Sequence, residues 1–334
     1  MKINSHKMLF LSIMILSSLI TLSSNNWLSM WMGLEMNLMS FIPLISKSKN
    51  KKSSQAMMIY FMAQSIGSMT FLFSVLMSPL AFMSIDMISE VSKMMMMISV
   101  MIKLGAAPFH MWLPEMMANL VWYECMLLMT WQKIAPLIVM SNMYPNEWFL
   151  YMFVIMSAAV GGIGGVNQTS LRKIMAYSSI NHLSWMMMFM SMNYSWYLYL
   201  IIYSMLIMMI CIMFNNKNIY FISQLMNSSV SMMETSTFIM LFLSIGGLPP
   251  FLGFLPKWMV LQSMINSGLY MMMVAMLLLS LLPLFYYMRL MSSFVLSYSM
   301  MNKWFKTPHM NSMVLFMFVS VNLMLPVFMV MGFV

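Results

Sequence analysis

Residues 105–114 read GAAPFHMWLP, and residues 247–256 read GLPPFLGFLP. The two stretches lie 142 positions apart and share Gly, Pro, Phe, Leu and Pro at matching places. Each interrupts a strongly apolar run, and each has a lysine at its edge, Lys103 and Lys257. Because proline removes a backbone N–H and clashes with the preceding turn, each stretch predicts a break inside a helix.

The composition indicates the solvent in which these helices lie. The chain is 62% hydrophobic and only 7% charged, with a mean hydropathy of +0.85. A soluble domain needs far more charged surface than this. Apolar runs of about 20 residues recur along the whole length, so we expect an all-α polytopic membrane protein embedded in the lipid bilayer.

The apolar runs predict about eleven transmembrane helices. The fourth and the ninth contain the proline stretches and are expected to be broken helices. The ninth is also too long for one straight span. The predicted ranges are 7–24, 26–46, 54–78, 91–112, 119–141, 147–166, 171–191, 194–214, 235–265, 268–292 and 311–333.

The matched stretches also predict an internal repeat. Their offset superposes the fourth helix on the ninth, five helices later. Five is an odd number, so the second unit enters the membrane from the opposite side, as in the inverted repeats of many ion-coupled transporters. We therefore expect a single membrane domain (1–334) with two inverted five-helix units, 7–141 and 147–292, followed by a C-terminal helix at 311–333.

The net charge of +9 could suggest nucleic-acid binding, but the positions of the charges favour a membrane protein. Twelve of the sixteen basic residues fall in loops on the N-terminal side, and only Lys93 falls in the opposite loops. This asymmetry predicts that the N-terminus faces the cytoplasm-equivalent compartment and the C-terminus the other side. The twelve are Lys2, Lys7, Lys47, Lys49, Lys51, Lys52, Arg172, Lys173, Lys217, Arg289, Lys303 and Lys306.

The remaining three lysines, Lys103, Lys133 and Lys257, lie inside predicted helices, as does the acid Glu35. A charged side chain at the centre of a bilayer costs about 2.5–3.5 kcal/mol even on a lenient scale. A lysine near a helix end can extend its ammonium to the interface, and Glu35 could form a structural ion pair. Groups retained at this depth otherwise mark ion or proton pathways.

A proton pathway would use these groups in a specific way. Burial favours the neutral form of a lysine and a nearby carboxylate favours the charged form, so movement of the acid changes the protonation of the lysine. Glu35 is the mid-helix acid available in the first unit. Glu124 is a weaker candidate because it lies near the start of its helix. The two breaks free backbone carbonyls and admit water, which a proton path needs.

Two histidines are further candidates for proton relay. His110 lies at the first break, and His182 lies in AYSSINHLSW among Ser and Asn residues. Imidazole titrates near physiological pH, although each ring could equally make a structural hydrogen bond. No His, Cys or carboxylate cluster has metal-ligand spacing, and we expect no cofactor or metal held by this chain. The two cysteines, Cys125 and Cys211, are expected to be small core residues.

Five segments together resemble the antiporter-like, proton-pumping membrane subunits of respiratory complex I (NADH–ubiquinone oxidoreductase) that animal mitochondria encode. They cover essentially the whole chain: SSNNWLSMWMGLEMNLMSFIPL (23–44), IKLGAAPFHMWLPE (102–115), LMTWQKIAPL (128–137), RKIMAYSSINHLSWM (172–186) and GGLPPFLGFLPKW (246–258). The count of 58 methionines is also typical of some mitochondrial genetic codes.

The resemblance implies residue roles that the residues alone do not give. It implies that Glu35 pairs with Lys103, that Lys133 is the central relay and that Lys257 hands the proton onward. No family feature matches Glu124, so a second partner for Lys133 stays open.

The resemblance also implies a mitochondrial inner-membrane location, with the N-terminus on the matrix side and the C-terminus on the intermembrane-space side. The partners would be other complex I subunits, especially neighbouring antiporter-like ones. NADH, FMN, iron–sulfur clusters and ubiquinone would then belong to the rest of the complex.

Two other functions remain open from the sequence. A free-standing cation/proton antiporter would share the fold and the buried lysines, but it should carry an ion-binding carboxylate near the breaks. A scaffolding subunit would have no need for three lysines at membrane depth. The sequence therefore favours a proton-translocating subunit of an NADH:ubiquinone reductase in which other subunits carry out the redox chemistry.

Overall fold

A computed structural model describes residues 5–46, 51–78, 86–143, 147–192, 194–227, 231–299 and 311–326. Within these ranges the chain is helical apart from turns, loops and an isolated antiparallel bridge between Ser170 and Phe221. Six helices in this part of the chain are long and apolar enough to cross a membrane. The predicted all-α membrane class is confirmed, whereas the count of eleven spans and the inverted orientation of the repeat stay predictions. The six are Ser5–Ser23, Trp27–Ile45, Lys51–Met77, Glu147–Val166, Trp196–Lys217 and Tyr270–Leu296.

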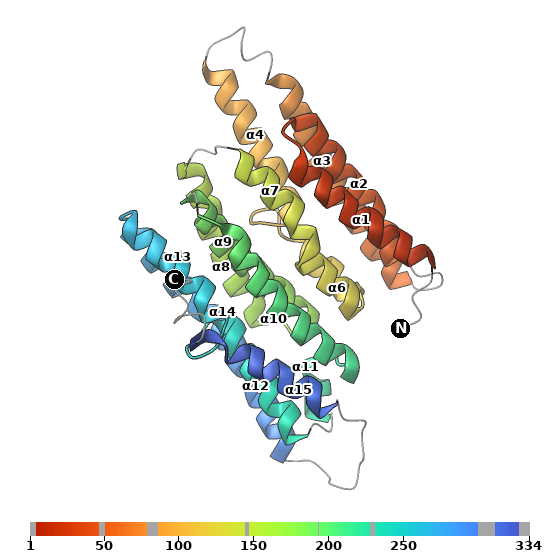
Figure 1. Cartoon of the computed structure of the whole chain (residues 1–334), viewed down its shortest axis with the longest axis vertical. Coiled ribbons are helices and arrows are strands. Elements are labelled where there is room, and N and C mark those ends of the chain that lie inside the picture. The colour runs from red at the N-terminus through yellow and green to blue at the C-terminus, as the bar shows by residue number, and fades with distance from the viewer. Residues whose placement is uncertain are drawn as a thin grey trace. The chain divides into compact units, whose positions relative to one another are not determined.

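The chain divides into two compact units, Met1–Phe153 and Val154–Val334. In the first unit α1, α2 and α3 lie side by side (Figure 1). Gly33 of α2 lies against Ser17 and Thr21 of α1, where any larger side chain would clash. Small residues of this kind let membrane helices approach closely. The helices of this unit are α1 (Ser5–Ser23), α2 (Trp27–Ile45), α3 (Lys51–Met77), α4 (Asp86–Leu104), α5 (Trp112–Asn119), α6 (Trp122–Met129), the 3₁₀ turn η2 (Trp131–Lys133) and α7 (Ile134–Asn142).

The helix predicted over 119–141 is divided in the structure. The backbone is extended at Leu120 and Val121, and η2 then separates α6 from α7. Two features of the sequence explain the second interruption. Pro136 has no N–H to donate to the carbonyl of Gln132, and the Thr130 hydroxyl donates to the Met126 carbonyl at 2.7 Å. Lys133 therefore lies at an irregular turn and not inside a continuous helix.

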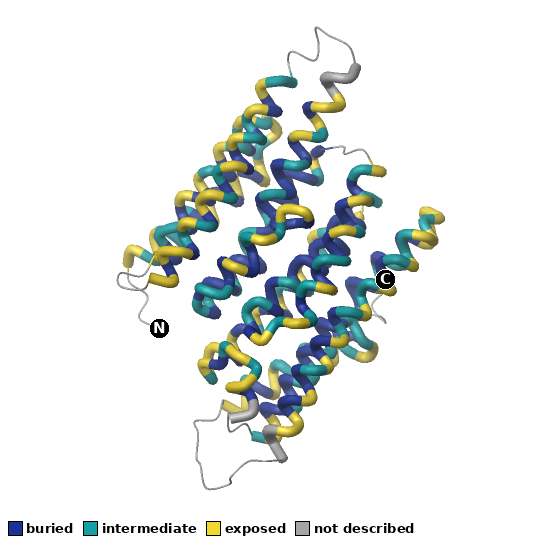
Figure 2. Tube along the Cα trace, turned by 180° about the vertical axis from the view of Figure 1, so that it is seen from behind, coloured by how far each residue is buried: buried dark blue, intermediate teal, exposed yellow. Residues whose placement is uncertain are grey.

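In the second unit, α8 packs on two neighbours through two pairs of glycines. Gly161 and Gly164 lie against α9, and Gly162 and Gly165 lie against α14. Buried and exposed positions are mixed along most of the helices (Figure 2), whereas α9 is buried along nearly its whole length. The helices are α8 (Glu147–Val166, which begins in the first unit), α9 (Leu171–Ser191), α10 (Trp196–Lys217), α11 (Ile222–Asn227), α12 (Met232–Gly246), α13 (Phe254–Asn266), α14 (Tyr270–Ser299) and α15 (Ser312–Asn322).

Both predicted breaks are present, between α4 and α5 and between α12 and α13, and their backbones match position by position. Gly105 and Gly247 adopt φ values of 70° and 76°. Their N–H groups bond to the carbonyls of Ile102 and Ser244 at 3.2 and 2.9 Å. The next N–H groups bond to those of Met101 and Leu243 at 3.1 and 3.2 Å, which completes a Schellman helix end in each case.

A cis peptide bond follows at matched positions, Ala107–Pro108 and Pro249–Pro250. The φ values and hydrogen bonds of the two helix ends show the same local structure at both breaks, which supports the internal repeat.

The C-terminal helix predicted over 311–333 is observed as α15, and residues 327–334 lie outside the described part of the chain. The end of α15 contacts the second break, because the Leu252 N–H donates to the Asn322 carbonyl at 3.0 Å. The short helix α11 lies in a segment for which no helix was predicted.

Candidate functional site

The first unit contains a small cavity that Lys103 and Lys133 both line. The volume is about 20 Å³, and an internal water needs roughly 10–15 Å³ by the same measure. The cavity therefore has room for a water molecule between the two lysines. Its polar lining is otherwise uncharged and comprises Asn37, Tyr60, Gln64 and Gln132.

Gln132 organises the polar wall of this cavity. Its side-chain Oε1 accepts from Asn37 Nδ2 at 2.9 Å and from the Tyr60 hydroxyl at 3.1 Å. Its Nε2 donates to Asn37 Oδ1 at 3.1 Å and lies 3.3 Å from the sulfur of Met14. Four helical segments are therefore tied together beside Lys133, the next residue along the chain.

Lys103 is buried in the last turn of α4, directly before the break. Its side chain lies along Gly67 of α3, where a Cβ atom would approach its Cγ to 2.9 Å. Its carbonyl accepts from Gln64 Nε2 at 3.0 Å, and Trp112 Nε1 donates to the Ile102 carbonyl at 3.1 Å. The C-terminus of a helix favours a positive charge, so this position suits an ammonium group.

Glu35 lies on α2 and is half-buried. It is the acid whose charge acts on Lys103. In the residues that the structure describes, the two groups do not form a direct ion pair. The expected pairing of Glu35 with Lys103 stays a prediction.

Lys133 is buried where η2 meets the start of α7. A helix N-terminus disfavours a positive charge, so Lys103 and Lys133 share a cavity but lie at helix ends of opposite polarity. Glu124 is also buried, and its carboxylate accepts from the Val121 N–H at 3.1 Å, capping α6. This contact gives the acid a structural role that the sequence did not indicate.

Lys257 occupies the second break in a different way. It lies in the first turn of α13, and its side chain extends back across the break, where Nζ donates to the Gly246 carbonyl at 2.6 Å. The ammonium also lies 5.8 Å from the centre of the Trp185 ring. Its partner is therefore the C-terminus of α12, which attracts positive charge. The sequence did not indicate this carbonyl as a partner for Lys257.

The two candidate histidines lie in unlike surroundings. His110 is half-buried in the first break, with Nδ1 3.2 Å from the Pro108 carbonyl oxygen. His182 is buried on α9, with Nδ1 2.9 Å from the Tyr199 hydroxyl and its ring 4.8 Å from that of Tyr203.

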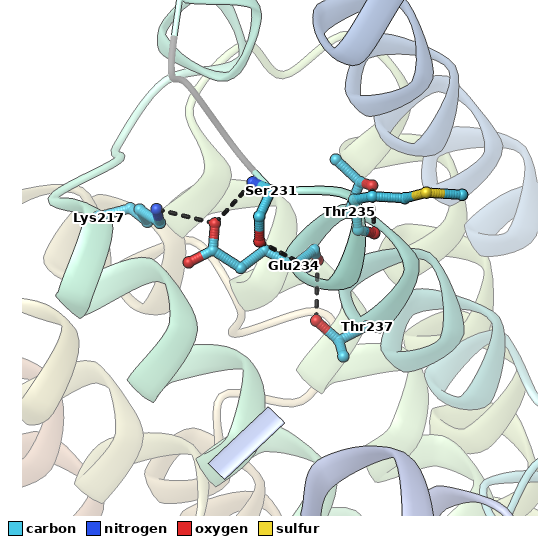
Figure 3. Close-up of polar contacts among 6 residues, drawn as sticks. Lys217, Ser231, Glu234, Thr235 and Thr237 are labelled. Atoms are coloured by element: carbon cyan, nitrogen blue, oxygen red, sulfur yellow. Dashed lines mark hydrogen bonds and ion pairs between the residues drawn. The ribbon is translucent and has the colours of Figure 1, made fainter. Parts of the chain in front are cut away.

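A buried ion pair joins α10 to α12, and sequence reasoning did not find it. Lys217 Nζ lies 3.0 Å from Glu234 Oε2, and Glu234 is fully buried (Figure 3). The same carboxylate accepts from the Ser231 N–H at 2.9 Å. Lys217 ends α10 and Glu234 lies in the first turn of α12, so each charge suits its helix end. The pair fixes the start of the half-helix that holds Lys257 at its other end.

Two further expectations from the sequence can be compared with the structure. Cys125 and Cys211 are buried and not joined by a disulfide bond, as expected of core residues. Arg289, assigned to a loop, caps α8 by donating to the carbonyls of Val166 and Gln168 at 2.6 and 2.8 Å. In the residues that the structure describes, no group of three His, Cys, Asp or Glu side chains could hold a metal ion.

The model of one protein family, described as NADH:quinone oxidoreductase/Mrp antiporter, TM, matches residues 24–283. The chain is 42% identical to NADH-ubiquinone oxidoreductase chain 2 of Locusta migratoria, over 93% of this chain and 92% of that protein. It is 40% identical to the protein of the same name from Anopheles gambiae, over 91% and 90%.

Two solved structures share the fold at lower identity. A chain of respiratory complex I from Thermus thermophilus is similar with a TM-score of 0.84 and 18% identity, covering 97% of this chain and 78% of that one. A chain of the Mrp complex from Dietzia is similar with a TM-score of 0.75 and 13% identity, covering 85% and 59%.

Proposed function

The chain belongs to the NADH:quinone oxidoreductase/Mrp antiporter family of membrane subunits, and we propose that it translocates protons as a core membrane-arm subunit of respiratory complex I. Its partners are other complex I subunits, and its location is the mitochondrial inner membrane. The matrix side holds the N-terminus and the intermembrane space the C-terminus, as the distribution of basic residues favours. The redox chemistry, with NADH, flavin, iron–sulfur clusters and ubiquinone, takes place in other subunits.

The observation that carries this proposal is the cavity shared by Lys103 and Lys133. A proton passes from one lysine to the other through water held by the neutral side chains of the wall. Glu35 stabilises the charged form of Lys103, and withdrawal of that charge releases the proton towards Lys133. In the second unit Lys257, held at the end of α12, is the corresponding carrier. His110 and His182 serve as further relay groups at the first break and on α9.

The test removes the charge of one candidate residue at a time in a complex that still assembles. Lys133→Ala and Glu35→Gln should each reduce the number of protons moved per NADH oxidised in sealed vesicles. Lys93→Ala and Glu90→Gln are matched controls, since both side chains are exposed on α4. Assembly is checked on native gels. Unchanged pumping by a fully assembled Lys133→Ala complex would exclude the relay role.

A free-standing cation/proton antiporter is the second candidate, because a chain of the Mrp complex shares the fold. The lining of the cavity argues against it, since neither an aspartate nor a glutamate is among the residues that line it. Hard cations are bound by oxygen ligands, among which carboxylates supply the negative charge, and the ammonium groups of the two lysines would repel such an ion. Native purification separates the two functions: co-migration with an NADH-oxidising assembly supports the complex I subunit, and a chain that runs alone rejects it.

A further inference from the structure

At the first break, side chains supply hydrogen-bond donors to the end of α4. The Ile102 carbonyl accepts from Trp112 Nε1 at 3.1 Å, and the Lys103 carbonyl accepts from Gln64 Nε2 at 3.0 Å. The last four carbonyls of any helix have no partner within the helix, and burying them unpaired costs free energy. In the first unit these two donors from α3 and α5 remove part of that cost.

The second break has no such donors at the corresponding positions. The offset of 142 residues places Phe254 where the first unit has Trp112. The same offset places Leu206 where the first unit has Gln64. Neither side chain has an N–H or O–H group. Leu206 lies at the second break, since its Cδ1 would be 3.2 Å from a Cβ atom on Gly253. The polar contacts of the first break are therefore not repeated in the second.

This difference leaves the Ile245 carbonyl without a donor. Ile245 is buried and corresponds to Lys103 of the first unit. The N–H that would bond to its carbonyl in a continuous helix belongs to residue 249, which is a proline. Among the residues that the structure describes, no other backbone N–H donates to it. The next carbonyl, that of Gly246, also precedes a proline by four residues, and there Lys257 supplies the donor.

An unpaired amide from the C-terminal helix lies at the same break. Asn322 is the last residue of α15, which packs on α12, and its carbonyl accepts from the Leu252 N–H at 3.0 Å. Its side chain is 1% exposed, and neither Oδ1 nor Nδ2 has a hydrogen-bond partner within the described ranges. Nearly all buried polar groups in proteins are paired, with ordered water where no protein group is in reach.

Water is the ligand that suits these groups. A buried water needs two to four polar partners, and the break offers the amide oxygen, the amide N–H groups and the Ile245 carbonyl. Water can accept from the amide and donate to the carbonyl, whereas the carbonyl and the amide oxygen are both acceptors. A metal cation does not suit the break, because the ammonium of Lys257 on the adjacent carbonyl would repel it.

We propose that Asn322 binds ordered water at the second break and that this water donates to the Ile245 carbonyl, in place of the side-chain donor of the first unit. Asn322 is then a positioning residue. It acts through Lys257, because the carbonyls of Ile245 and Gly246 are neighbours at the helix end that binds the ammonium. The inference gives the C-terminal helix, which lies outside both repeats, a part in the second break. Its effect on pumping rests on the proposed function.

The experiment removes the amide and then restores a donor from the other side. Asn322→Leu, made in the intact complex, should lower the number of protons moved per NADH, with NADH oxidation retained. Asn322→Ser keeps a polar group and should retain the yield. Leu206→Gln introduces the donor of the first unit, so the Leu206→Gln, Asn322→Leu double variant should recover the yield. Ser320→Ala is the matched control on α15, because the Ser320 hydroxyl bonds only within its own helix.

A direct observation of the water accompanies these variants. An electron cryomicroscopy map of the unmodified complex, at a resolution that shows ordered water, should contain density within hydrogen-bond distance of the Asn322 side chain and the Ile245 carbonyl. A map that resolves both groups without such density would overturn the inference. If Asn322→Leu does not assemble, this map decides.

The outcomes separate the inference from the proposed function. If Lys133→Ala lowers the proton yield and Asn322→Leu does not, Asn322 has no positioning role and the proposed function stands. A yield that Leu206→Gln fails to recover would show that the missing donor is not the cause. If neither Lys133→Ala nor Glu35→Gln lowers the yield, the proposed function fails, and the map still decides whether Asn322 binds water.

Discussion

Gly247 lies where the backbone and the Lys257 side chain meet, and Gly247→Ala tests what holds this lysine. A Cβ atom there would approach the Cδ, Cε and Nζ of Lys257 to between 2.6 and 2.8 Å. The ammonium would then have to leave the Gly246 carbonyl. A hydrogen bond to a charged group contributes about 1.5–3 kcal/mol, so the held state of Lys257 should become less populated by roughly ten- to a hundredfold.

Gly247→Ala also costs free energy through the backbone, and this cost must be subtracted from the total loss of stability to isolate the effect on Lys257. Gly247 has a φ of 76°, and a residue with a side chain in this left-handed region loses about 1–2 kcal/mol. Gly268 provides the matched control, since its φ is 74° and a Cβ atom there would meet nothing within 4 Å. Gly268→Ala therefore carries the same backbone cost without touching Lys257.

The assay compares thermal stability and protons moved per NADH in complexes that carry either variant. Both variants should lower stability by a similar amount for the backbone, and Gly247→Ala should lower it by about 1.5–3 kcal/mol more and reduce the proton yield. Lys257→Ala removes all three clashing atoms, so the Gly247→Ala, Lys257→Ala double variant should be no less stable than Lys257→Ala beyond the backbone cost. Equal stability and equal proton yield for Gly247→Ala and Gly268→Ala would refute the argument.

Two further perturbations test the polar contacts of each unit. Gln132→Leu leaves the amide of Asn37 buried without its partner, so we expect a loss of about 1–3 kcal/mol of stability and a lower proton yield, measured by thermal melting and vesicle pumping. An unchanged yield would show that the amide contacts do not support transfer. Glu234→Gln or Lys217→Met alone leaves a buried charge unpaired and should cost about 3–5 kcal/mol, whereas the double variant should recover most of this. Additive losses in a double-mutant cycle would show that the pair contributes nothing jointly.

Much of the fold could be predicted because placing a charged residue or an unpaired backbone group in lipid costs free energy. Prolines at 108 and 250 and lysines at 103, 133 and 257 stand out in such a chain, and both breaks occur where the prolines predicted them. The helices predicted over 147–166 and 171–191 match α8 and α9 at both ends. Local interruptions of a helix were harder to predict from the sequence. The turn at Lys133, for example, depends on one proline and one threonine hydroxyl within an otherwise apolar run.

The uncharged polar residues of the candidate site were harder to identify from the sequence than the charged ones. Asn37, Gln64 and Gln132 are polar residues inside apolar helices, and this could have marked them, but an amide costs less at membrane depth than a charge does. Tyr60 gave no signal at all, because a tyrosine is unremarkable in such a helix. Only packing showed that Asn37 and Gln132, 95 positions apart, share two hydrogen bonds.

The sequence by itself determined the membrane class, the broken helices and the buried charges, since each follows from the free energy of placing a residue in lipid. The tertiary structure decided the partner of each charge. Lys103 lines the same cavity as Lys133, while Lys257 donates to the carbonyl of Gly246 at the end of α12. Partners depend on which backbone atoms the breaks leave unpaired and on which helices pack together. Both are properties of the folded chain that the spacing of residues does not encode.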